Sequence, residues 1–215
     1  MTINFKECLL KSVHTADFLI SENTAQKFEL YYQELLQWNA KVNLTTITEP
    51  ADAAIKHFLD SVLVMKYIPL AGALIDIGTG AGFPGIPLKI MNPGLSVVLV
   101  EAVRKKVSFL KQIIRLLKLQ GIEVYNGRIE EYDRCAAFDF AVSRAFSELG
   151  LFCRLAAPFI KPGGMLLAMK GSDKKELAAT LETPPCGYTC AALHTYELPQ
   201  HKGKRSLVVL QKCFT

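Results

Sequence analysis

Apolar residues recur with helical spacing in the first third of the chain. Between Thr24 and Trp38 they fall every three or four positions, the period of an amphipathic helix, and Thr24 has the side chain of a helix cap. A second helix is expected to open at Pro50, since proline fits a first helical turn, and to end before Pro69. We therefore predict that residues 1–70 form a helical cap.

From Leu74 onward, short apolar runs alternate with helical segments. The runs ALIDI, SVVLVE, IEVYN, FDFAVS and MLLAM are typical of buried strands. The helices expected between and after them cover residues 84–91, residues 104–119, a short stretch near Glu130, and residues 147–160.

Turn signals and the C-terminal segment complete this pattern. Gly121 is expected to close the helix that begins at Arg104, and KPGG to form a turn before MLLAM. Two further strands, over 189–198 and 206–213, are joined by a polar loop. The alternation predicts an α/β fold for residues 71–215, as one compact unit. We expect a doubly wound, mostly parallel sheet with helices on both faces and an antiparallel strand at its C-terminal edge.

The sequence IDIGTGAGFPGIP follows the first predicted strand. Ligands of open parallel sheets bind at the carboxyl ends of strands, and glycines let the backbone bend tightly and approach a ligand. Gly80, Gly82 and Gly85 match the dinucleotide fingerprint GxGxxG. Glu101 ends the second strand, where an acid can accept both hydroxyls of a ribose. The turn is therefore a candidate nucleotide-type site.

Two prolines change this interpretation. Pro84 and Pro87 lack the N–H groups with which a helix N-terminus binds a pyrophosphate. S-adenosylmethionine suits the turn better than a dinucleotide, because it has one carboxylate, a positive sulfonium and no phosphate. Asp76 would lie near the positive region of this ligand, or it is a strand-end acid that binds the amides of the turn. Both interpretations stay open, and a nicotinamide-dependent oxidoreductase is the alternative enzyme class.

Composition and charge point to a globular protein with an anionic partner. Hydrophobic residues make up 50% and charged residues 21% of the 215 residues, and no apolar run has the length of a membrane span. Without a signal-peptide pattern, we expect a cytoplasmic protein. Residues 151–215 contain nine basic and four acidic side chains, which accounts for a net charge of +5. Nothing in the sequence requires more than a monomer.

Cysteines and histidines near the C-terminus have a spacing that resembles a metal site. Cys186, Cys190, His194 and His201 form the pattern CxxxC, then HxxxxxxH after three further residues. Zinc sites usually contain closer cysteine pairs. We therefore expect isolated, reduced thiols and surface histidines here, and no bound metal.

Seven short blocks carry a family resemblance over nearly the whole chain. They are WNAKVNLT, HFLDS, DIGTGAGFPGIP, RIEE, SRAF, MKG and GKRSLVVL. Together they resemble the bacterial 16S ribosomal RNA guanine-N7 methyltransferases of the glucose-inhibited division protein B family. Phe83 departs from the leucine common at that position, although it is also apolar. The resemblance implies a fold of the S-adenosylmethionine-dependent methyltransferase type. The implied cofactor is S-adenosylmethionine, and the implied partner is 16S rRNA or the small ribosomal subunit.

The matching blocks also imply site residues. The resemblance implies cofactor contacts at Gly78, Phe83, Ile129, Glu130 and Arg144. Gly80 and Glu101, which the glycine-rich turn and the following strand indicate, complete the expected set. For RNA contact or guanine positioning we predict Arg128, Lys170 and Arg205. The basic face of the helix after Arg104 is either an RNA contact or a solvated surface. A non-enzymatic rRNA-binding or assembly factor remains a further alternative.

The expected chemistry agrees with N7 of guanine. This nitrogen has an in-plane lone pair and no proton, so it attacks a sulfonium methyl group without a general base. Methylation of an exocyclic amine favours polar acceptors after the fourth strand, and SRAF lacks them. The N7 edge of a regular RNA helix lies in a deep groove, which favours a loop guanosine. His57 and Asp60, three residues apart, are expected to tie the cap to the sheet rather than to form a local pair.

Overall fold

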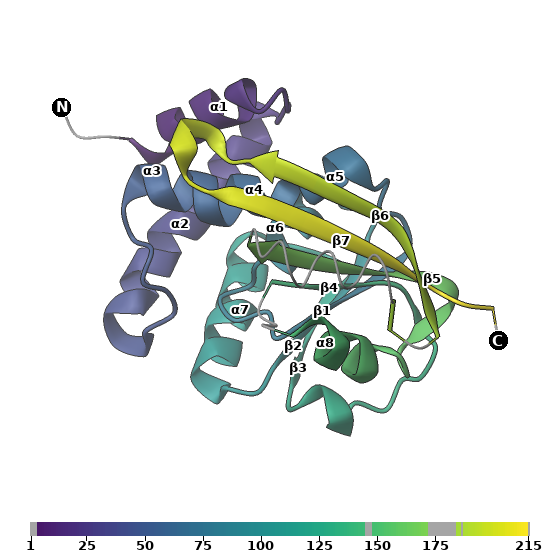
Figure 1. Ribbon diagram of the computed structural model, residues 1–215. Coiled ribbons are helices and arrows are strands. Elements are labelled where there is room, and N and C mark those ends of the chain that lie inside the picture. Colours follow the sequence, from purple (N-terminus) through teal and green to yellow (C-terminus); the bar gives the residue numbers. More distant parts are fainter. Residues whose placement is uncertain (1–3, 145–147, 172–183, 186, 215) are drawn as a thin grey trace.

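The computed structural model describes residues 4–144, 148–171, 184–185 and 187–214. Within this part of the chain the apolar runs of the sequence form the strands of one sheet (Figure 1). The strands are β1 (Ala73–Ile77), β2 (Ser96–Glu101), β3 (Ile122–Asn126), β4 (Phe138–Ser143), β5 (Ile160–Gly171), β6 (Tyr188–Glu197) and β7 (Lys204–Lys212).

The sheet has seven strands in the order β3-β2-β1-β4-β5-β7-β6. Neighbouring strands from β3 to β5 are parallel, whereas β7 is antiparallel to both β5 and β6. The expected α/β fold with an antiparallel C-terminal addition is confirmed. Ile77 pairs with Val100, and Asp76 with Val142, so β1, β2 and β4 end at the same edge.

Helices and helical turns pack on both faces of the sheet. Those of the N-terminal part are α1 (Phe5–Thr15), α2 (Glu22–Val42), α3 (Pro50–Ala53), the π-helical turn η1 (Ala54–Leu59), α4 (Asp60–Val62) and α5 (Val64–Tyr67). The others are α6 (Gly85–Met91), α7 (Arg104–Leu116), η2 (Ile129–Glu131), α8 (Leu149–Ala156) and η3 (Pro199–His201).

Side chains that alternate along the strands belong to two cores. Leu74 and Leu99 belong to the core that also contains the apolar residues of α2, η1 and α7. Ile75 and Val98 belong to the opposite core, with Phe152 of α8. Figure 1 accordingly shows the purple and blue N-terminal helices gathered on one side of the sheet. The first core is continuous between these helices and the strands, which fixes the cap over one face.

Two helix ends differ from their predictions. Ser21, not Thr24, caps α2, because the Ser21 hydroxyl accepts a hydrogen bond from the Thr24 N–H. Both residues have a capping hydroxyl group, and the chain uses the one that lies a turn earlier. Helix α7 ends at Leu116, and Lys118 has the left-handed φ of 51°, so Gly121 does not close it. The predicted first-turn position of Pro50 is confirmed.

The prediction of a turn at KPGG is wrong. These residues lie inside β5, where the pairing with β4 shifts between Phe138 and Phe140. Gly163 has φ +75°, a value that a glycine adopts at low cost. The irregularity bends the strand without ending it, because β5 pairs with β4 on both sides of the shift.

Polar contacts tie the cap to the antiparallel part of the sheet. Asp60, at the start of α4, is 1% exposed. Its carboxylate accepts hydrogen bonds from Tyr196 Oη at 3.2 Å and from Arg205 Nε at 3.1 Å. The His57 side chain bonds to Arg144 rather than to the Asp60 carboxylate. The interpretation of His57 and Asp60 as ties between cap and sheet is therefore confirmed.

Candidate functional site

The glycine-rich turn after β1 takes a shape that needs its glycines. Gly78, Gly80 and Gly82 have φ values of 72°, 61° and 93°, in the left-handed region that other residues rarely adopt. A Cβ atom on Gly80 would meet no heavy atom within 4 Å. The space beside Gly80 is therefore open.

The backbone N–H groups of this turn are almost all donated within the protein. The donated groups belong to Gly78, Thr79, Gly80, Gly82, Phe83, Gly85, Ile86 and Leu88. Pro84 and Pro87 have none. Over residues 78–88, all of them described, only the N–H of Ala81 lacks an acceptor. A pyrophosphate needs several converging donors, so the turn suits a ligand that requires a single one.

Asp76, fully buried near the end of β1, binds two groups of the turn. Its Oδ2 accepts hydrogen bonds from Thr79 Oγ1 at 2.7 Å and from the Gly85 N–H at 2.8 Å. The interpretation of Asp76 as a strand-end acid that binds the turn is thus observed. Its Oδ1 has no partner among the described residues. Burial raises the pKa of this carboxyl group to about 6, although its hydrogen bonds oppose the shift.

Glu101, at the end of β2, holds the other side of the turn. Its Oε2 accepts a hydrogen bond from the Gly80 N–H at 3.0 Å, and its Oε1 accepts one from the Val103 N–H at 2.8 Å. A carboxylate offers about four acceptor positions. Glu101 therefore keeps acceptor capacity for further hydroxyl groups while its orientation is already set.

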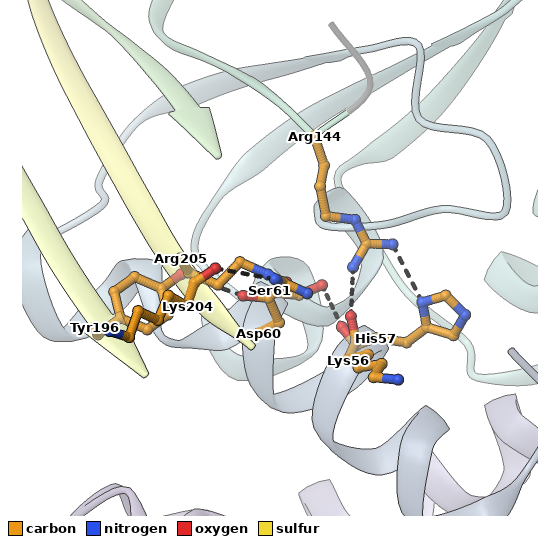
Figure 2. Close-up of polar contacts among 8 residues, drawn as sticks. All are labelled: Lys56, His57, Asp60, Ser61, Arg144, Tyr196, Lys204 and Arg205. Carbon is orange, nitrogen blue, oxygen red and sulfur yellow. Dashed lines mark hydrogen bonds and ion pairs between the residues drawn. The ribbon is translucent and has the colours of Figure 1, made fainter. Parts of the chain in front are cut away.

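Arg144 reaches from the end of β4 to the cap (Figure 2). Its Nη1 donates to the Lys56 carbonyl at 2.9 Å, and its Nη2 to His57 Nδ1 at 3.3 Å. The guanidinium carbon also lies 5.2 Å from the centre of the Phe83 ring. That ring stacks on His57 at 4.6 Å, so Phe83 and Arg144 both pack against the cap.

The contacts of His57 determine its protonation. Arginine only donates hydrogen bonds, so Nδ1 of His57 is the acceptor and Nε2 carries the proton. Nε2 then donates to Thr45 Oγ1 at 2.8 Å. Burial, with help from the charges of Arg144 and Lys56, lowers the pKa of His57 to about 3. His57 is neutral at physiological pH.

The structure groups only some of the residues predicted for the RNA. Lys170 at the end of β5 and Arg205 at the start of β7 line one cavity of about 300 Å³, together with Arg144. Arg128 precedes η2 beyond β3, which is four strand positions from β5. At about 4.8 Å for each strand spacing, this places β3 roughly 19 Å from β5, and β7 lies one strand further.

Two of the expected cofactor contacts, Ile129 and Glu130, lie in the 3-10 turn η2. The Ile129 side chain is buried in the second core, whereas Glu130 and the preceding Arg128 are exposed. Arg104, Lys111 and Arg115, which form the basic face of α7, are also exposed. In the cysteine and histidine pattern that resembles a metal site, His194 stacks on Tyr67, and Cys186 lies outside the described residues.

Lys56 is a cavity residue that the sequence analysis missed. It lies in η1 of the cap, next to the HFLDS block. Its position beside this block is the one sequence signal that could have identified Lys56. Its closeness to β5 and β7 could not be predicted, because it depends on how the cap packs on the sheet. Lys56, Arg144, Lys170 and Arg205 thus line the cavity together with Asp60. Arg205 pairs with Asp60, whereas the Lys56 ammonium group pairs with Asp52 at 2.8 Å.

Comparison with known proteins decides the family. Residues 24–207 match the family described as "GidB: rRNA small subunit methyltransferase G". The chain belongs to this family. It is 43% identical over 177 residues to the Ribosomal RNA small subunit methyltransferase G of Caldanaerobacter subterraneus subsp. tengcongensis, covering 80% of this chain and 74% of that protein. The identity to its counterpart in Geobacter sp. (strain M21) is 39% over 209 residues, or 95% and 96% of the two chains.

Solved structures share the fold at low identity. A SAM dependent methyltransferase from Aquifex aeolicus has a TM-score of 0.57 and 18% identity, over 74% of this chain and 92% of that one. P. horikoshii TYW2 in complex with MeSAdo has a TM-score of 0.59 and 14% identity, over 74% and 63%. With the family match, these confirm an rRNA methyltransferase with the expected fold, rather than an oxidoreductase.

No described helix combines the length and apolarity of a bilayer span.

We predict that His57 makes folding stability depend on pH. Its pKa falls from 6.5 in the unfolded chain to about 3 in the fold, so the unfolded state binds the extra proton between these values. The His57 contribution is therefore complete above pH 6.5 and is lost as pH falls toward 3. The slope is up to about 1.4 kcal/mol per pH unit. Urea unfolding at pH 7.5 and pH 5 should show a smaller difference for His57→Gln than for wild type. His194→Gln, on the edge strand, should retain the full difference.

Proposed function

We propose that this protein transfers a methyl group from S-adenosylmethionine to N7 of a loop guanosine in 16S rRNA. The observation that carries the proposal is the pair of unused groups at the turn. One is an unpartnered buried oxygen of Asp76, and the other is the undonated N–H of Ala81. A zwitterionic, phosphate-free ligand fits this pair, because its cation complements the carboxylate and its carboxylate complements the N–H.

The residues around the turn would hold the cofactor in three ways. Asp76 would face its positive region, the backbone from Gly78 to Ala81 its amino-acid end, and Glu101 its ribose hydroxyls. Phe83, Ile129, Glu130 and Arg144 remain proposed contacts of the same ligand. When bound, S-adenosylmethionine supplies an electrophilic methyl group.

The polar groups of the cavity support an acceptor that needs no general base. His57 holds its only proton toward Thr45 and accepts from Arg144, so neither ring nitrogen is free. Asp60 is 1% exposed and ion-paired with Arg205. Both arrangements disfavour transfer of a proton from a substrate amine. Guanine N7 has a lone pair and no proton, so positioning alone suffices for its methylation.

Charge supports RNA as the substrate. We infer that Lys170 and Arg205 contact RNA phosphates near the target nucleotide. Lys56 joins them on the cavity wall, and Arg128 contacts a more distant part of the same RNA. The N7 edge is accessible in loops rather than in regular helices. We propose 16S rRNA or the small ribosomal subunit as the partner of a monomeric enzyme.

The decisive test is to locate the methyl group. Purified protein is incubated with labelled S-adenosylmethionine and either naked 16S rRNA or small subunits, and the RNA is treated with borohydride and aniline. We expect label in the RNA and chain cleavage at one guanosine, because this treatment cleaves at N7-methylguanosine. Labelled RNA that resists cleavage would refute the N7 assignment. Absence of label from both substrates would refute the proposed activity.

We predict that the affinity for S-adenosylmethionine depends on the ionisation of Asp76. Its pKa of about 6 means that a proton competes with a cationic ligand at lower pH. Calorimetric titration should show the Kd rising by up to about tenfold per pH unit below pH 6. Asp76→Asn should bind weakly and without this dependence. Asp139→Asn, at the opposite edge of the sheet, should keep the wild-type profile. A flat wild-type profile would argue against the proposed contact.

We predict that Lys56 contributes to RNA affinity. Lys56→Met should raise the KM for RNA roughly tenfold and reduce the slope of log affinity against log salt by about one, the effect of losing one phosphate contact. The Kd for S-adenosylmethionine should stay unchanged. Lys66→Met, which removes an exposed cation of the same cap, is the matched control. Equal RNA kinetics in the two variants would exclude Lys56 from the RNA site.

A further inference from the structure

Tyr31 of helix α2 connects the cap directly to the glycine-rich turn. Its side chain is fully buried, and its hydroxyl group donates a hydrogen bond to the carbonyl of Ala81, fifty residues away. Its ring stacks on that of Phe83, with centres 5.2 Å apart and planes within 4°. A Cβ atom on Gly82 would collide with the Tyr31 hydroxyl. Glycine at this position therefore lets the turn close around the tyrosine.

The contact fixes the part of the turn that still has a free donor. On one side of Ala81, the Gly80 N–H is bound to Glu101, and on the other side the Gly82 N–H is bound to Thr79. Tyr31 occupies the Ala81 carbonyl from the cap. The N–H groups on both sides of Ala81 are therefore held by the protein, whereas the Ala81 N–H has no acceptor among the described residues.

We propose that Tyr31 is a positioning residue for the methyl donor. The Ala81 carbonyl belongs to the planar peptide unit that follows Ala81. By anchoring this unit, Tyr31 restricts the backbone of Ala81 and so keeps its N–H available for the carboxylate of S-adenosylmethionine before the cofactor arrives. This inference rests on the proposed function. It gives the helical cap a role in cofactor binding, in addition to any role toward RNA. A preformed donor raises affinity because the ordering of the turn no longer opposes binding.

The neighbouring residue provides a matched control. Tyr32 is also buried, and its hydroxyl donates to the Thr48 carbonyl at 2.6 Å. Its ring stacks on Phe5, with centres 4.3 Å apart. It thus makes the same kind of bond from the same helix, but both partners belong to the cap. Removing either hydroxyl group leaves one carbonyl without its donor. Only the carbonyl bound by Tyr31 belongs to the glycine-rich turn.

The experiment compares Tyr31→Phe with Tyr32→Phe in the full chain. Melting temperature, calorimetric Kd for S-adenosylmethionine, and steady-state kinetics are measured for both and for wild type. We expect both variants to melt at lower temperature, since each loses a buried hydrogen bond. Only Tyr31→Phe should raise the Kd and KM for S-adenosylmethionine, by about tenfold. The KM for RNA and the kcat at saturating cofactor should stay near wild type.

A measurement without cofactor keeps the inference testable if the proposed function fails. Amide hydrogen exchange over residues 78–86 should be faster in Tyr31→Phe than in Tyr32→Phe or wild type, because the turn loses its anchor. If wild type does not bind S-adenosylmethionine, the proposed function is refuted, and this exchange difference still decides whether Tyr31 holds the turn. Equal cofactor affinity in the two variants, or equal exchange, would overturn the role of Tyr31.

Discussion

Two carboxylates hold the glycine-rich turn, and the arrangement of the whole site depends on them. Asp76 and Glu101 end adjacent parallel strands, so the sheet itself places them a strand apart at one edge. One binds the Gly85 N–H at the far end of the turn, and the other binds the Gly80 N–H at its near end. The burial of Asp76 is costly, and its hydrogen bonds to the turn offset part of that cost. The turn consequently has its shape before any ligand binds.

This pre-formed turn explains why one sequence motif allows two ligand classes. The spacing of glycines is that of a dinucleotide site, but the backbone donors that such a ligand needs are occupied or replaced by proline. Which of the two ligand classes the turn can bind depends on its free N–H groups, and the motif alone does not describe them. In the sequence, only Pro84 and Pro87 indicate that donors are missing, and they were sufficient to favour a ligand without phosphate.

Local signals in the sequence predicted much of the fold and little of the contacts between distant segments. Five runs identified the strands β1 to β5. The inner strands have mostly apolar stretches, as buried parallel strands do. β3, at the edge of the sheet, has no fully buried residue and mixes apolar with polar positions. Ser21 and Thr24 are both local capping candidates, and spacing alone does not rank them. The passage of β5 through KPGG depends on its pairing with β4, which spacing does not report. The bonds from Tyr31 to Ala81 and from Arg144 to His57 join residues 50 and 87 positions apart. The position of Lys56 at the cavity and the distance of Arg128 from the cavity likewise depend on how distant segments pack, which local signals do not report.

The reversed direction of β7 has a consequence for how the cavity is completed. Gly171, at the end of β5, pairs with Arg205 near the start of β7. A parallel strand in that place would begin at the opposite edge, and its first residues would lie roughly 30 Å away. The reversal instead brings Arg205 beside the end of β5. During synthesis, therefore, the cluster of positive charge is assembled only after Arg205 has left the ribosome.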